Sequence, residues 1–68
     1  MKVREVIRLL ERNGFQFARQ RGSHRHFKGI VKGRTRVVVV PGAEGEDVPK
    51  GTLGSIRRQS GLPAHLFR

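Results

Sequence analysis

Two short glycine-containing turns divide the middle of this chain into three runs of extended character. The turns fall at residues 21–23 (Arg-Gly-Ser) and 32–34 (Lys-Gly-Arg). The runs are residues 15–19, 24–31 and 35–40. Their alternating or β-branched apolar side chains are typical of strands, and the first run is expected to be half-buried. Because turns this short join antiparallel neighbours, the sequence predicts a three-stranded meander that stops at Pro41-Gly42.

Helices are expected before and after this meander. The first covers residues 2–12, where apolar side chains recur at helical spacing before a stop at Asn13-Gly14. The second is shorter, follows Pro49 and ends at Gly61. The apolar positions are Val3, Val6, Ile7 and Leu10 in the first helix, and Leu53 and Ile56 in the second.

This order of elements predicts an α+β fold with the sequence α-β-β-β-α. A three-stranded antiparallel sheet would carry both helices on one face, which is the layout of the double-stranded RNA-binding domain. With 68 residues, the chain is a single domain, 1–68, near the lower size limit for independent folding. We expect residues 37–40 and the tail residues Leu62, Leu66 and Phe67 to join the core. Residues 43–47 hold three of the five acidic residues and are expected to form a mobile loop.

The charge balance predicts a polyanionic partner. The chain has fifteen Lys and Arg residues but only five Asp and Glu residues, which gives a formal charge of +10. This charge favours nucleic acid as the partner. No run of about 18 apolar residues and no signal-peptide pattern is present, which favours a cytoplasmic protein with no membrane partner. The chain has no cysteine, which excludes disulfides and thiolate zinc sites. Since His24, His26 and His65 are not spaced like zinc ligands, we expect no metal and no cofactor.

The middle strand offers a candidate site for acid–base chemistry. If Phe27 points to the helices, then His24, His26 and Lys28 point to the open face of the sheet. Imidazole has a pKa of about 6.5, so it accepts and donates protons near neutral pH. Cleavage of RNA needs a base for the 2′-hydroxyl and an acid for the departing 5′-oxygen. The cations available to neutralise the phosphate are Lys28, Arg25, Arg21 and Arg19.

Plainer interpretations stay open for several of these residues. A histidine in a basic strand can be an ordinary surface residue or a phosphate contact, and His65 is expected on the surface. The second acid or base is either His26 or a water molecule. Gly22 is either an ordinary turn glycine or a gap that lets a phosphate backbone approach. Ser23 hydrogen-bonds either a phosphate or a neighbouring backbone group.

Two blocks of the sequence form a pattern known from one protein family. The first, residues 21–28, reads Arg-Gly-Ser-His-Arg-His-Phe-Lys and contains Gly-Ser-His-x-x-Phe. The second, residues 48–62, contains Pro-x-Gly-Thr-Leu-x-x-Ile-x-x-Gln-x-Gly-Leu. In this order, at this separation and on a chain of this length, the blocks resemble the HicA family of bacterial and archaeal toxin–antitoxin systems. The acidic residues 44–47 depart from the family, since many members carry a His- or Lys-rich segment there.

The resemblance implies metal-independent cleavage of messenger RNA by a single catalytic histidine, which is His24 here. It also implies a HicB-type antitoxin partner that covers the active surface. We assign RNA contacts to the residues around His24: Arg19, Arg21, Gly22, Ser23, Arg25, His26 and Lys28. The alternatives are a non-catalytic RNA-binding module of the same fold and a basic structural or DNA-associated protein, neither of which needs an imidazole at position 24.

Overall fold

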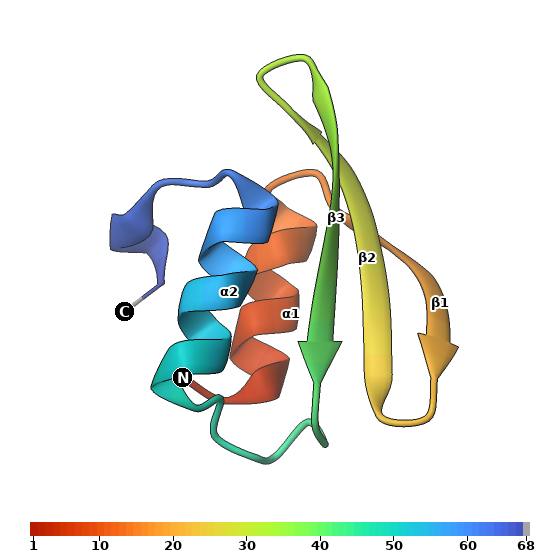
Figure 1. The fold of residues 1–68 in the computed structure, drawn as a ribbon, viewed down its shortest axis with the longest axis vertical. Helices are drawn as coiled ribbons and strands as arrows, with labels where there is room; N and C mark the ends of the chain where they lie inside the picture. Colours follow the sequence, from red (N-terminus) through yellow and green to blue (C-terminus); the bar gives the residue numbers. More distant parts are fainter. Residues whose placement is uncertain (68) are drawn as a thin grey trace.

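A computed structural model of the protein describes residues 1–67, with two helices covering one face of a three-stranded sheet (Figure 1). The elements in chain order are α1 (Val3–Arg12), β1 (Gln16–Arg21), β2 (His24–Val31), β3 (Arg34–Pro41), α2 (Lys50–Ser60) and the 3-10 turn η1 (Ala64–Leu66). The sheet order is β1-β2-β3, and both pairs are antiparallel. This confirms the predicted α+β order and meander, and it is consistent with the layout of the double-stranded RNA-binding domain.

The two hairpin turns are one residue tighter than predicted. Lys32 and Gly33 both have positive φ, 52° and 77°, as the two central residues of a type I′ turn require. Gly22 also has positive φ, 57°, in the turn between β1 and β2. Each turn therefore contains two residues, and Arg21 and Arg34 belong to the strands that flank them.

The core lies between the helices and the inner face of the sheet. Each of the following apolar side chains is at most 1% exposed: Val3, Val6, Leu10, Phe27, Val38, Val40 and Ile56. The tail returns to this core as predicted, because Phe67 is buried and Leu62 and Leu66 pack against it. The prediction that all of residues 37–40 are core is wrong in part. Val37 is 50% exposed because side chains alternate along β3 and every second one faces away from the helices.

β1 differs from its prediction. It begins one residue later than expected, and all of its residues are exposed. Phe15 is buried just before the strand, and its ring lies so close to Gly29 that a Cβ there would approach it to 2.8 Å. Phe17 is 54% exposed and meets Phe27 edge to face, with ring centroids 5.9 Å apart. The physical reason is position, since β1 is the edge strand farthest from both helices (Figure 1).

Residues 43–48 form a hydrogen-bonded turn where the sequence predicted a mobile loop. The carbonyl groups of Glu44 and Glu46 accept the backbone N–H groups of Arg4 and Val3 at 3.1 and 2.9 Å. These N–H groups belong to the first turn of α1, where a helix offers its donors no internal partner. The acidic turn thereby caps α1 and fixes its start.

α2 closes the outer edge of β3. The side-chain carbonyl of Gln59 accepts the backbone N–H of Val39 at 2.9 Å. The helix then ends at Gly61, whose φ of 69° is the left-handed conformation that glycine adopts without strain. The edge of β3 is therefore partly occupied, whereas β1 keeps a free edge.

Candidate active site

The face of the sheet opposite the helices carries both strand histidines. Phe27 points into the core, so its neighbours on β2 alternate to the other side, as predicted. His24 and Lys28 are exposed there, and His26 between them is half-buried. We call this side of the sheet the open face. Two residues span about 7 Å along a strand, so the two imidazoles begin far enough apart to flank one phosphate group.

A β-bulge brings two arginines onto the same face. Phe17 pairs with Phe27 on the helix side, yet Arg19 pairs with His26 and Arg21 pairs with His24. The register shifts between Phe17 and Arg19, because one extra residue is inserted there. Side chains of directly paired residues lie on one face with Cβ atoms about 5 Å apart. Each open-face histidine therefore has an arginine beside it.

The other neighbours of the histidines are apolar. Pro41 pairs with His24, and Val39 pairs with His26, both from β3. Each imidazole thus has an arginine on its β1 side and an apolar residue on its β3 side. All five acidic residues of the chain lie outside residues 16–41, so no carboxylate of the sheet offsets this positive charge.

The structure separates Arg25 from the other predicted site residues. It pairs with Val40 on the helix side of the sheet, and its side chain is only 20% exposed. Its guanidinium donates to the carbonyl of Gly42 at 3.1 Å and lies 3.9 Å from the carboxylate of Glu44. Arg25 therefore braces the acidic turn and is not directed toward the open face.

The turn residues lie at the end of the histidine row. Gly22 and Ser23 are exposed and directly precede His24. Two hydrogen bonds hold this turn: the side-chain amide of Gln20 donates to the carbonyl of Gly22 at 2.8 Å, and the backbone N–H of Gly42 donates to the carbonyl of Ser23 at 3.1 Å. Both predicted turn residues thus directly precede the strand that carries the two histidines.

His65 lies apart from the other two histidines. It is exposed in η1, as expected for a surface residue. Within residues 1–67, no three His, Asp or Glu side chains gather as a metal-binding group. In the same part of the chain, no helix is long and apolar enough to cross a membrane.

A family model described as "HicA toxin of bacterial toxin-antitoxin" matches residues 3–62 of the 68. The chain belongs to the HicA toxin family. It is therefore a toxin of a toxin–antitoxin system, and this membership implies a cognate antitoxin. No curated protein matches the chain.

The two HicA-like sequence blocks have different places in the fold. The first spans the β1–β2 turn and the first half of β2, and it fixes the faces of that strand. His24 and Phe27 are three residues apart, so burial of the phenylalanine turns the histidine outward. The second block is α2 with its flanks, where Ile56 fills the core, Gln59 holds β3 and Gly61 ends the helix. That second block supports the sheet and contributes no side chain to the histidine row.

Sequence reasoning found the histidines but missed the bulge. In the sequence, Phe17, Arg19 and Arg21 have the same parity, which places all three on one face of a regular strand. The extra residue, Ala18, moves the arginines to the open face. The sequence did contain a signal for the bulge: in a regular strand both arginines would lie on the buried side of the sheet, where unpaired charges are too costly. The exposure of Ile30 (70%) and Val37 (50%) on the same face was also missed.

Proposed function

We propose that this HicA toxin is an endoribonuclease that cleaves messenger RNA, with His24 as its catalytic residue. The observation that carries the proposal is the pairing of His24 with Arg21 and of His26 with Arg19 on the open face. Imidazoles supply proton transfer, and the adjacent guanidinium groups supply positive charge for a phosphate. The family's toxin character fits an activity against an essential RNA.

The proposed reaction is a transfer of the phosphodiester to the neighbouring 2′-oxygen. The imidazole of His24 takes the proton of the 2′-hydroxyl, and the 2′-oxygen forms a bond to phosphorus. The bond from phosphorus to the 5′-oxygen breaks, and that oxygen takes a proton from His26 or from water. The products are a 2′,3′-cyclic phosphate and a free 5′-hydroxyl. Both proton transfers use side chains or water, so the proposed reaction needs no metal.

The remaining open-face cations would bind the RNA backbone. Arg19, Arg21 and Lys28 stabilise the extra negative charge that builds on the phosphate oxygens in the transition state. At the turn formed by Gly22 and Ser23, the RNA backbone could approach the protein closely, since the glycine carries no side chain. Arg25 is left out of this set, because its guanidinium is engaged on the helix side.

We also propose that the cognate antitoxin is of the HicB type and covers the open face. The face combines positive charge with exposed apolar side chains, of which Ile30 and Val37 are the largest. An acidic surface on the partner would complement the positive charge, and burial of the apolar side chains would add affinity. Such a partner would block the histidines from RNA.

The test is cleavage of RNA by purified protein in EDTA. We expect the wild-type protein to produce cyclic-phosphate ends, which a contaminating metal-dependent nuclease would not leave. His24→Ala should reduce the rate by about 100-fold or more, since general acid–base catalysis contributes at least that much. His65→Ala is the matched control, because it removes an exposed imidazole far from the row. Circular dichroism should show that all variants are folded.

Two outcomes would contradict the proposal. Equal cleavage by wild type and His24→Ala would move the chemistry to His26 or to a contaminant. Tight RNA binding without any cleavage would favour the non-catalytic RNA-binding module.

A further inference from the structure

A shallow concavity of about 450 Å³ lies on the open face, next to the row of histidines. It is bounded by Gln16 and Ala18 of β1, by Lys28 and Ile30 of β2, and by Thr35 of β3. Lys28, which lines the concavity, is two residues along β2 from His26 and on the same face, so the concavity lies next in line after the two histidines. The β-bulge shapes its β1 side, since Ala18 is the inserted residue.

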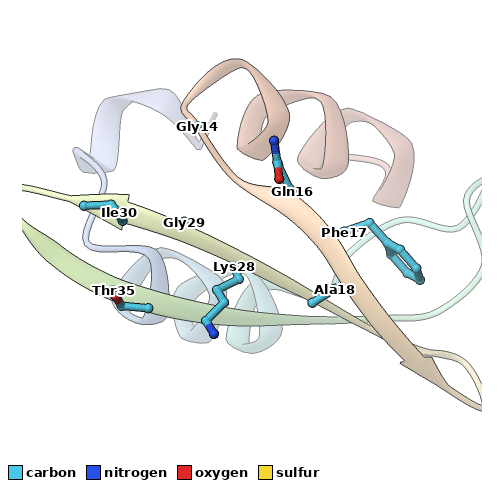
Figure 2. A pocket seen from close by; sticks show the side chains of 8 residues that line it. All are labelled: Gly14, Gln16, Phe17, Ala18, Lys28, Gly29, Ile30 and Thr35. Atoms are coloured by element: carbon cyan, nitrogen blue, oxygen red, sulfur yellow. The ribbon is translucent and has the colours of Figure 1, made fainter.

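The lining combines one apolar surface with several polar groups. Ile30 is 70% exposed, the largest exposure of any large apolar side chain in the described part of the chain. Figure 2 shows Ile30 and Thr35 together at one end, Lys28 in the middle and Gln16 beyond it on β1. The ring of Phe17 lies at the margin and turns away from the others (Figure 2). An exposed aliphatic surface flanked by an amide and a hydroxyl suits a flat heterocycle with polar edges.

We propose that this concavity binds one unstacked nucleobase of single-stranded RNA, from a nucleotide next to the scissile phosphate. This inference rests on the proposed ribonuclease function. Ile30 supplies the surface against which the base packs. The amide of Gln16 and the hydroxyl of Thr35 can each donate and accept hydrogen bonds at the edge of the base. Lys28 lies between the base site and the phosphates that Arg19 and Arg21 would bind.

The same placement argues against duplex RNA as the substrate. In a duplex the bases are stacked and paired, so none can pack its face on a side chain. Proteins that take single strands combine a positive track for the backbone with surfaces for splayed bases. The open face has both features side by side, although the order of its elements is that of a double-stranded RNA-binding domain. Cleavage should therefore depend on the base at one position beside the cut.

The test uses short oligonucleotides with a single ribonucleotide at the cleavage position. An abasic residue replaces each neighbouring nucleotide in turn, and kcat/KM is measured for wild type, Ile30→Ala and Val37→Ala. We expect one abasic position to lower wild-type kcat/KM by about 10-fold, the effect of losing one packed base. Ile30→Ala should show a similar loss with the intact oligonucleotide and little further loss with the abasic one. Val37→Ala is the matched control, because Val37 is also an exposed β-branched aliphatic side chain on the same face but lies outside the concavity, and it should keep the full base effect.

The outcomes separate this inference from the function on which it rests. Wild-type cleavage that does not depend on any neighbouring base would overturn the base site alone. The same holds if Ile30→Ala keeps the base effect and instead weakens antitoxin binding, which would assign the concavity to the protein partner. If wild-type protein cuts none of the oligonucleotides, the ribonuclease function fails, and the base site fails with it.

Discussion

Neighbouring residues on β2 have unrelated tasks because a strand sends them to opposite sides. His24 faces solvent beside Arg21, whereas Arg25 faces the helices and holds the carbonyl of Gly42. Both arginines look equivalent in the sequence, since both flank the histidine motif. The structure places Arg21 beside His24 on the open face and engages Arg25 in a hydrogen bond on the helix side.

Substitution of these two arginines should separate the roles. Arg25→Ala should lower the free energy of unfolding by about 1 kcal/mol, because a part-buried hydrogen bond is lost. Arg21→Ala should leave stability unchanged but reduce the slope of log K for RNA against log salt by about 1, as expected for one phosphate contact. Urea unfolding and binding to a non-cleavable oligonucleotide at several salt concentrations measure the two effects. A normal stability together with a reduced slope for Arg25→Ala would return Arg25 to the RNA-binding set.

At the level of the elements, the sequence predicted the helices, the strand order and the outward face of β2. These features follow from local patterns: helical spacing in residues 2–12, tight glycine turns, and Phe27 as a buried anchor. The exposure of β1, the bulge at Ala18 and the docking of the acidic turn were not predicted. These features depend on residues that are distant in the sequence: on the distance of β1 from the helices, and on the N–H groups in the first turn of α1. A short stretch of sequence does not contain that information.

Contact between elements also makes Gly29 intolerant of a side chain. A Cβ at this position would come within 2.8 Å of the buried ring of Phe15, which links the α1–β1 connection to β2. Gly29→Ala should lower the free energy of unfolding by about 1–3 kcal/mol, as overpacking does. Gly51→Ala is the matched control: its Cβ would meet nothing within 4 Å in α2, so it should stabilise the protein by about 0.5–1 kcal/mol. Equal effects of the two changes in thermal unfolding would contradict the close contact.

For the whole molecule, charge decides how partners approach. The formal charge of +10 comes with a sheet that contains no acidic residue. A field of this kind raises the rate at which an anionic partner arrives and orients it toward the positive side. On the proposed function, both RNA and an acidic antitoxin would benefit, and the two would compete for the same approach as well as for the same surface.

Association with the cognate antitoxin should therefore be fast at low salt and slow at high salt. We expect the association rate to fall by roughly 10-fold or more over that range, with a smaller change in dissociation. Arg19→Gln should lower the low-salt rate more than Arg12→Gln, which removes the same charge from the exposed side of α1. Stopped-flow measurements decide the matter, and a rate independent of salt would refute electrostatic steering.

The hydrogen bond from Val39 to Gln59 has a consequence for the behaviour of many copies together. Sheets aggregate when an exposed edge accepts a strand from another molecule, and this bond occupies part of the β3 edge. Copies of the toxin can then add strands mainly through β1. There Arg19 and Arg21 of one copy would meet those of the next, and like charges would repel. If the toxin binds RNA through its uncovered sheet, as proposed, the same positive charges would also keep its copies from joining into a polymer of their own.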